Sequence, residues 1–436
     1  MNGKRGARIV QVGAAVWASI GAATAQPPPA NDTAPGFAWE IVEKRSAEGV
    51  ESVDIDLTSQ LWRGEPWRHA IRMVKPPDLI HGETALLAIT GGSNGRDGAP
   101  RRRVEIDALF AAQIARNARS IAVILGQVPN QPLFGRQYED DAIAYTFDRY
   151  LDTGDPTWPL LGPMTQSAVS AMDAATAAAR ELWGIELKQF FVSGASKRGW
   201  TAWLTAAADP RVIGIAPAVI DNLNLPAQMK HQIATWGAYS PEIEAYTRLD
   251  LPQRIGEPRT GELIRLIDPY SRRERLTMPK LILVGTNDPY WVVDAARFYF
   301  SDLSGPKHLY YIPNGGHGPG PGAAEAIAAY YSILREGGEL PKIEWTFEES
   351  TGATAVAIRA EPRPLEARLW SAESLDADLH DAAWSAAPIA LDGGGPIEAR
   401  VEAPEFGRRA FYVELRYAAP REGTFGLCTE VRVVAR

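Results

Sequence analysis

Six short runs of almost entirely apolar residues recur between positions 84 and 312, and stretches with helical spacing accompany them. The runs are TALLAIT (84–90), SIAVILG (120–126), QFFVSG (189–194), VIGIAPAVI (212–220), KLILVG (280–285) and HLYYI (308–312). Apolar residues recur at helical spacing in 104–118, 164–183, 198–208 and 323–334. A strand that is apolar along its whole length is buried on both faces, as in a parallel sheet covered by helices. The pattern therefore predicts an α/β domain with a mostly parallel sheet between layers of helices.

Two regions interrupt this alternation and divide the chain. Residues 222–275 hold aromatic and charged side chains between two sheet strands, and we expect an inserted cap there, with a solvated surface excursion as the alternative. After residue 340, short alternating stretches separated by Pro, Gly and Asp predict a β-sandwich over 341–436. The α/β domain is accordingly expected to cover 37–340.

The first 36 residues are expected to lie outside the fold. Lys4, Arg5 and Arg8 precede an apolar stretch over 9–22, and Ala23-Thr24-Ala25 forms an A-x-A cleavage site. These features are typical of a secretory signal peptide over 1–25, followed by a Pro-rich tail over 26–36, although a buried N-terminal helix is the alternative. No later apolar run reaches membrane-spanning length. We therefore predict a periplasmic or secreted protein without an integral membrane segment in the mature chain.

Composition limits the partners and cofactors. Apolar residues make up 45% of the 436 positions, which supports a sizeable core, and the formal net charge of −8 argues against nucleic acid as a partner. Cys428 is the single cysteine, so the chain can form no intramolecular disulfide and no multi-cysteine metal site. We expect a small-molecule or peptide substrate and neither a metal nor a cofactor.

A candidate nucleophile lies between the third apolar run and the helix that follows it. Ser196 stands in the segment GASKRG (194–199), where a serine is presented on a sharp strand-to-helix turn. Small residues at Gly194 and Ala195 give that turn room. The usual pattern is G-x-S-x-G, but Arg198 occupies its last position and Gly199 follows one place later. A Gly-Ser turn that caps a helix is the alternative.

A nucleophilic serine needs a base, and in folds of this kind the chain order is Ser, acid, His. His317 lies in the Gly-rich segment PNGGHG (313–318), directly after the last apolar run. Asp288 follows the fifth run by three residues and is the leading acid. Asp221, after the fourth run, is the alternative acid. This order predicts an α/β-hydrolase fold with Ser196, Asp288 and His317 as a catalytic triad.

Neighbouring residues are expected to stabilise and bind the substrate. The N–H of Lys197 and an N–H from Gly92 or Ser93 would form an oxyanion hole. Lys197 and Arg198 place two cations at a helix N-terminus, where the helix dipole disfavours them. We therefore hypothesise that at least one contacts an anionic substrate group. The expected substrate-binding residues are Arg198, Gln127 and Trp291.

Several strings resemble the PhoPQ-activated pathogenicity-related protein family over most of the mature chain. They are QVPNQP (127–132), ED (139–140), AY (144–145), WPL (158–160), PMT (163–165), AMD (171–173), the elbow segment 193–200, VIDNLN (219–224) and GTND (285–288). The resemblance implies an exported bacterial protein of the α/β-hydrolase superfamily, from a family linked to defence against host peptides. It supplies no substrate.

The expected activity is hydrolysis of an ester or amide through an acyl-enzyme on Ser196. A serine peptidase is one alternative. A non-catalytic binding or signalling protein on a hydrolase scaffold is the other.

Overall fold

The computed structural model describes residues 34–435 except 81, 103–105, 136 and 392. The expected signal peptide and all but the last three residues of the Pro-rich tail lie outside the described residues. Export therefore stays a prediction.

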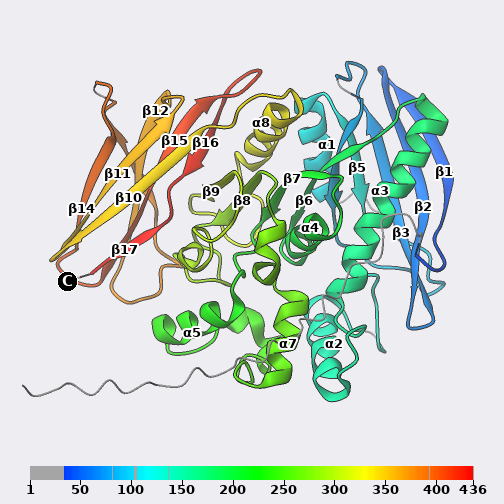
Figure 1. Ribbon diagram of the computed structural model, residues 1–436, viewed down its shortest axis with the longest axis horizontal. Helices are drawn as coiled ribbons and strands as arrows, with labels where there is room; N and C mark the ends of the chain where they lie inside the picture. The colour runs from blue at the N-terminus through cyan, green and yellow to red at the C-terminus, as the bar shows by residue number, and fades with distance from the viewer. Residues whose placement is uncertain (1–33, 81, 103–105, 136, 392, 436) are drawn as a thin grey trace, which may run out of the picture. The chain divides into compact units, whose positions relative to one another are not determined.

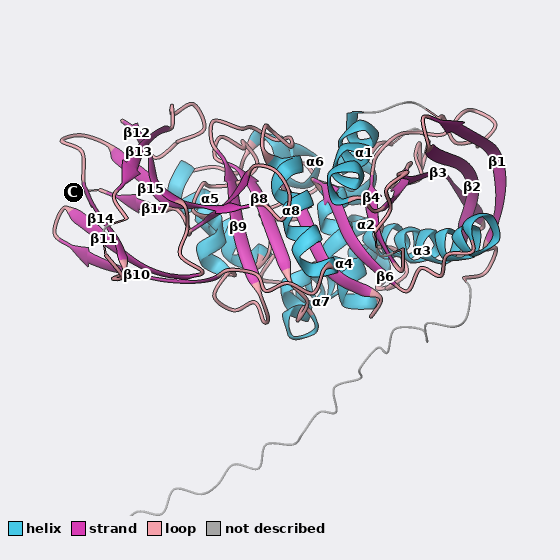
Figure 2. Ribbon diagram, turned by 90° about the horizontal axis from the view of Figure 1, so that it is seen from above, coloured by secondary structure: helices cyan, strands magenta, loops and turns pink. Residues whose placement is uncertain are grey.

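One large sheet runs through the described residues, from β1 at one end to β13 at the other (Figures 1 and 2). Its strand order is β1-β2-β3-β5-β4-β6-β7-β8-β9-β16-β15-β12-β13, and β17 pairs with β15. The strands up to β9 are β1 (Ala38–Ala47), β2 (Val50–Trp62), β3 (Glu65–Lys75), β4 (Thr84–Ile89), β5 (Ile121–Leu125), β6 (Gln189–Ala195), β7 (Val212–Ala218), β8 (Lys280–Gly285) and β9 (Lys307–Ile312).

Strands β4 to β9 are the six apolar runs, and all of their pairings with one another are parallel. Helices α1 (Ile106–Ala118) and α8 (Ala323–Arg335) pack together on one face of this part of the sheet, and α3 (Leu161–Trp183) and α4 (Lys197–Ala208) cover the other. Neighbouring strand residues point to opposite faces. Phe191 accordingly packs on Tyr330 and Tyr331 of α8, while Phe190 and Val192 belong to the core beneath α3 and α4. The predicted α/β-hydrolase fold class is confirmed.

The C-terminal strands form two packed layers, as predicted. Strands β10 (Lys342–Ser350), β11 (Ala353–Glu361) and β14 (Ile397–Glu402) make a separate three-stranded antiparallel sheet. Strands β12 (Glu366–Ser374), β13 (Ser385–Ile389), β15 (Arg408–Ala418), β16 (Thr424–Cys428) and β17 (Arg432–Val434) extend the large sheet, because Cys428 pairs with Leu309 of β9. Apolar side chains of β11 and β14 share one core with those of β15. The exact division of the chain at residue 340 stays a prediction.

A group of helical segments lies at the carboxyl ends of the parallel strands (Figure 1). They are α2 (Glu139–Thr153), α5 (Leu225–Trp236), η1 (Pro241–Ile243), α6 (Glu244–Thr247), α7 (Pro258–Ile267), η2 (Pro269–Arg275) and η3 (Ala295–Phe298). Most of them come from the region between β7 and β8, where the cap is expected. Loops at the carboxyl ends of parallel strands are where α/β proteins place their ligand sites.

Candidate active site

Ser196 occupies the strained turn between β6 and α4. Its φ of 57° and ψ of −128° lie where non-glycine residues are rarely found. The Ser196 N–H donates to the carbonyl of Ala218 on the neighbouring strand β7 at 2.8 Å, which helps to hold this conformation. The hydroxyl therefore stands at the N-terminus of α4, where the helix dipole is positive.

The two glycines of the turn are required by close backbone contacts. A Cβ at Gly194 would lie 2.6 Å from the carbonyl oxygen of Arg198. A Cβ at Gly199 would lie 2.6 Å from Ile220 Cγ2 and 2.9 Å from the carbonyl oxygen of Gly194. The point where strand and helix cross therefore falls at Gly199, one residue later than in G-x-S-x-G. This explains why Arg198 can occupy the usual glycine position.

Ser196, His317 and Asp288 form a continuous chain of hydrogen bonds. His317 Nε2 lies 2.7 Å from Ser196 Oγ, and Nδ1 lies 2.8 Å from Asp288 Oδ2 and 3.0 Å from Oδ1. A carboxylate only accepts hydrogen bonds, so Nδ1 is the donor and Nε2 is left to accept from the serine hydroxyl. Tyr290 stacks on the imidazole at 4.0 Å between ring centroids, and its N–H donates to Asp288 Oδ1. Asp288 is 2% exposed.

The loops that carry Asp288 and His317 are both tied to the connection between β12 and β13. Asn287 donates from Nδ2 to the carbonyls of His380 and Ala382. Asn314 donates to the carbonyl of Trp384 at 3.0 Å and accepts from its N–H at 2.8 Å. The C-terminal strands thus hold the acid and histidine loops through two asparagine amides.

The alternative acid, Asp221, is hydrogen-bonded to a tyrosine. One carboxyl oxygen accepts from the Tyr299 hydroxyl, and the other has no hydrogen-bond partner among the described residues. Burial raises the pKa of Asp221 to about 7, and nearby Asp288 adds to the effect. The structure therefore brings Asp288, and not Asp221, to His317.

Replacing Asp221 with asparagine should change the pH dependence of folding. The folded-state pKa of about 7 exceeds the usual 3.8, so the wild-type protein loses stability as pH rises from about 4 to about 7. Asparagine keeps an acceptor for Tyr299 without a charge. The unfolding free energy of Asp221→Asn should exceed that of the wild type by a margin that grows with pH over this range, by up to about 1.4 kcal/mol per pH unit. Urea unfolding at several pH values measures this margin, and a constant margin would contradict the assignment.

Lys197 and Arg198 are paired with two carboxylates from the first turn of α2. Lys197 Nζ lies 3.0 Å from Glu139 and 3.1 Å from Asp140, and Arg198 makes two hydrogen bonds to Glu139. Burial alone would raise the pKa of Glu139, but the attraction of Arg198 and Lys197 outweighs it and lowers the pKa to about 2. Asp140 also accepts from the Tyr246 hydroxyl at 2.9 Å. Within this cluster two positive charges meet two negative ones.

Two residues expected to bind substrate, Arg198 and Gln127, have protein partners, and a role in substrate binding stays a prediction for both. Arg198 also donates to the carbonyl of Val128, and it does not line the cavity described below. Gln127 was expected to contact substrate, but its buried amide accepts from the Ala70 N–H and donates to the carbonyl of Arg101. Both side chains therefore hold parts of the scaffold together, because their polar atoms are already used by protein groups.

Gly92 and Ser93 lie in the loop after β4, as expected, but neither lines the cavity. The carbonyl of Gly92 accepts from Gln131 at 2.9 Å, and that of Ser93 accepts from the N–H of Arg101. Gly91 lies against Arg198, since a Cβ there would come 2.6 Å from the guanidinium. A role for Gly92 or Ser93 in an oxyanion hole stays a prediction.

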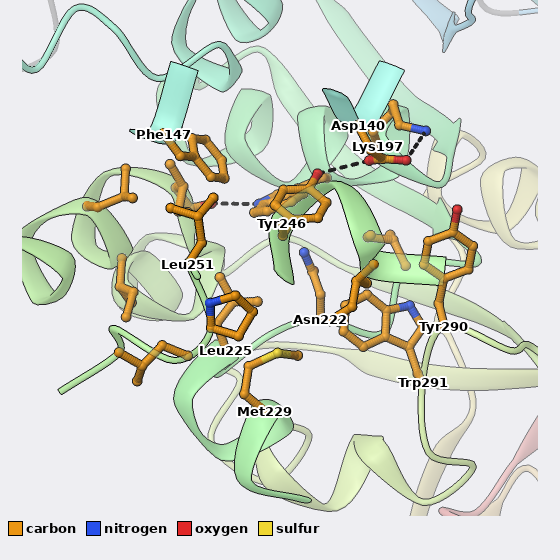
Figure 3. A pocket seen from close by; sticks show the side chains of 18 of the residues that line it. Asp140, Phe147, Lys197, Asn222, Leu225, Met229, Tyr246, Leu251, Tyr290 and Trp291 are labelled. Atoms are coloured by element: carbon orange, nitrogen blue, oxygen red, sulfur yellow. Dashed lines mark hydrogen bonds and ion pairs between the residues drawn. The ribbon is translucent and has the colours of Figure 1, made fainter. Parts of the chain in front are cut away.

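Ser196 and His317 line a cavity with a volume of about 100 Å³. Figure 3 shows this cavity from close by. Its walls are mostly apolar and come largely from α5, α7 and the segments between them. The apolar and aromatic residues that line it are Phe147, Trp200, Ile220, Leu225, Met229, Ile243, Tyr246, Leu251, Pro252, Ile255, Leu263, Ile264, Ile267, Tyr290 and Trp291. Trp291 was expected at the site and lies there. Lys197 and Asp140 also line the cavity.

Sequence reasoning assigned no role to several residues of this site. The acids Glu139 and Asp140, the amides Asn287 and Asn314, and Asn222 in the cavity wall are the main ones. One signal was present: two adjacent cations at a helix N-terminus require nearby anions, and Glu139-Asp140 is an acidic pair in a family-like string.

The described part of the chain contains no cluster of His, Cys, Asp or Glu suited to a metal ion. None of its helices combines the length and hydropathy that crossing a bilayer requires.

Comparisons with known proteins give one curated relative and several solved structures. Autocrine proliferation repressor protein A of Dictyostelium discoideum is 27% identical over 442 residues, covering 91% of this chain and 88% of that protein. An acetyl xylan esterase from Paenibacillus sp. R4 is 15% identical with a TM-score of 0.47, covering 71% of this chain and 91% of its own. A glucuronoyl esterase from Solibacter usitatus is 10% identical with a TM-score of 0.44, covering 69% and 86%.

A family model also matches most of the chain. It spans residues 30–381, which include the elbow, the acid and histidine loops and the cavity. The resemblance seen in the sequence is therefore confirmed, and the chain belongs to the PhoPQ-activated pathogenicity-related protein family.

Proposed function

We propose that this protein is an exported serine hydrolase that cleaves a carboxylic ester through an acyl-enzyme on Ser196. The observation that carries the proposal is the pair of hydrogen bonds that His317 makes: it accepts from Ser196 Oγ at 2.7 Å and donates to Asp288 at 2.8 Å. A hydroxyl, an imidazole and a buried carboxylate in this order are the parts of a nucleophilic triad. The apolar cavity beside Ser196 supports the proposal, because it offers a binding site for an acyl group.

The first half of the reaction forms the acyl-enzyme. His317 Nε2 takes the proton of Ser196 as Oγ attacks the ester carbonyl, and a tetrahedral oxyanion forms. Asp288 holds the Nδ1 proton and stabilises the resulting imidazolium. The imidazolium then returns the proton to the alkoxide, the carbon–oxygen bond breaks, and the alcohol leaves.

The second half regenerates the enzyme. His317 takes a proton from a water molecule as that water attacks the acyl carbonyl. The new tetrahedral intermediate collapses, Ser196 Oγ recovers its proton from His317, and the carboxylic acid leaves. In both halves the N–H of Lys197 at the start of α4 would donate to the oxyanion, with a second N–H expected from Gly92 or Ser93.

Hydrolysis of short p-nitrophenyl esters, compared with that of matched p-nitroanilide peptides, tests the proposal. The wild type should hydrolyse the esters, and Ser196→Ala should reduce turnover to the uncatalysed rate. Ser193→Ala is the matched control, because this hydroxyl lies on the same strand but donates to the carbonyl of Ala216. Ester turnover that persists in Ser196→Ala would overturn the proposal, and turnover of the anilides alone would identify a peptidase.

Removing the Asn314 amide should lower turnover without unfolding the protein. Asn314→Ala breaks the two hydrogen bonds to Trp384, so the loop that carries His317 loses its tie to the C-terminal strands. Displacement of a catalytic group by about 1 Å can cost roughly 100-fold in rate, so we expect kcat to fall about 10- to 100-fold. Ester kinetics with parallel thermal melts measure both effects. Asp376→Ala, an exposed position in the same connection, should leave kcat unchanged, and equal kcat in all three proteins would contradict the prediction.

A further inference from the structure

Three polar groups on the cavity wall have no hydrogen-bond partner among the described residues. They are the amide of Asn222, the hydroxyl of Thr260 and the indole N–H of Trp291. All three side chains are buried, and Asn222 is 0% exposed with both its nitrogen and its oxygen unpaired. Proteins pair nearly all buried polar groups with protein or with a bound molecule, so an unpaired amide in a cavity marks a place where water or a ligand can bond to it.

Asn222 is well placed to contact a group bound at Ser196. It follows β7, which pairs with β6 up to the register Ala195–Ala218, so the segments carrying the two residues leave neighbouring strands at the same edge. Figure 3 shows the Asn222 amide directed into the space between the cavity walls. The remaining walls near it are apolar, with Leu225 and Met229 among them.

The charges at the cavity do not call for an ionic ligand. Lys197, the cation among the lining residues, is paired with Glu139 and Asp140. An anionic acyl group would therefore have to compete with two carboxylates for that ammonium. An occupant that suits this site is neutral and mainly apolar, and it carries one group able both to donate to and to accept from Asn222.

We infer that the cavity binds the acyl chain of a neutral ester that carries a secondary amide, and that Asn222 pairs with this amide. The inference rests on the proposed function and names a substrate class for the same site. Thr260 and Trp291 offer further polar contacts along the same wall.

A stability measurement separates this role from a structural one. Asn222→Leu removes unpaired polar atoms and keeps a similar volume, so the melting temperature of the free protein should stay equal or rise. Gln228→Leu is the matched control. Its buried amide in α5 donates to the carbonyls of Leu223 and Ala295, so this variant should melt at a lower temperature than the wild type.

The substrate preference is tested with pairs of p-nitrophenyl esters of equal chain length. N-acetylglycine, N-acetyl-β-alanine and N-acetyl-4-aminobutanoate esters are compared with pentanoate, hexanoate and heptanoate esters. In the wild type, kcat/KM should favour the amide member of at least one pair by about 10-fold, and Asn222→Leu should abolish that preference. Thr260→Val, which removes another of the three unpaired side-chain polar groups, should fold normally and serve as a second variant.

Calorimetric binding of the same esters to Ser196→Ala tests the inference without catalysis. Tighter binding of the amide member, lost in Ser196→Ala/Asn222→Leu, would support it even if the wild type showed no turnover and the proposed function failed. Equal binding and equal kcat/KM within all three pairs would overturn it. A fall in melting temperature for Asn222→Leu as large as that for Gln228→Leu would also overturn it.

Discussion

Replacing His317 with alanine is expected to lower kcat for ester hydrolysis by about 10⁶-fold, and Asp288→Asn by about 10⁴-fold. Without the imidazole, no group remains to take the proton of Ser196, because Nε2 of His317 is the atom that faces its Oγ at 2.7 Å. Asparagine at 288 keeps the shape of the side chain but can donate to Nδ1, which favours the wrong imidazole tautomer. Steady-state ester kinetics on folded variants measure both losses.

The matched control for the acid is Asp221→Asn. Asp221 accepts a hydrogen bond from Tyr299, whereas the carboxylate bonded to His317 Nδ1 is Asp288, so we expect kcat of Asp221→Asn to stay within about three-fold of the wild type. A larger loss in Asp221→Asn than in Asp288→Asn would show that the acid has been assigned to the wrong residue.

Gly199→Ala is expected to cost both stability and activity. The added Cβ would lie 2.6 Å from Ile220 Cγ2 and 2.9 Å from the carbonyl oxygen of Gly194, and backbone cannot move away as a flexible side chain would. Overpacking of this kind typically costs about 1–3 kcal/mol and sometimes more. Any relaxation would shift Ser196, so kcat should also fall by about 100-fold. Urea unfolding and ester kinetics measure the two effects.

Gly162→Ala provides the comparison. Gly162 lies in α3, and apart from its chain neighbours no atom lies within 4 Å of an added Cβ. The ring of Pro163 disfavours a Cβ on the helical residue before it, which offsets the usual gain from Gly to Ala. Alanine should therefore change the free energy of unfolding by less than about 1 kcal/mol and leave kcat unchanged. If the free energy of unfolding of Gly199→Ala equals that of the wild type, the close contact of Gly199 with Ile220 and the Gly194 carbonyl is contradicted.

The parallel part of the sheet could be predicted because its strands are buried on both faces. Runs such as KLILVG (280–285) then read as continuous apolar segments, and β8 has the predicted bounds. The elbow was found for a related reason: a strand, a Gly-Ser turn and a helix follow one another within 20 residues, so local sequence determines the geometry. The acid loop and the histidine loop each follow one of the predicted strands, so their order along the chain could be predicted as well.

The antiparallel strands β1 to β3 were not predicted, nor was α2. Only part of β2 is buried and β1 is largely exposed, so their polar residues hide the strand pattern. Helix α2 begins with three acidic residues and reads as a polar segment.

Contacts between residues that lie far apart in the sequence could not be predicted either. Arg198 meets Glu139 across 59 positions, so its charge was assigned to a substrate although a protein carboxylate neutralises it. The partners of Gln127 were not predicted for the same reason, because they lie on β3 and in the loop after β4. The bonds from Asn287 and Asn314 to the C-terminal strands also join segments about 70 to 95 positions apart. Composition and periodicity carry no information on such pairs.

The most direct test of a nucleophilic serine is to treat the folded wild-type protein with a fluorophosphonate and map the adduct by peptide mass spectrometry. We expect one phosphonyl group on the peptide that contains Ser196, and no adduct in the His317→Ala variant. A folded wild-type protein that stays unmodified at Ser196, or that is modified at another serine, would contradict it.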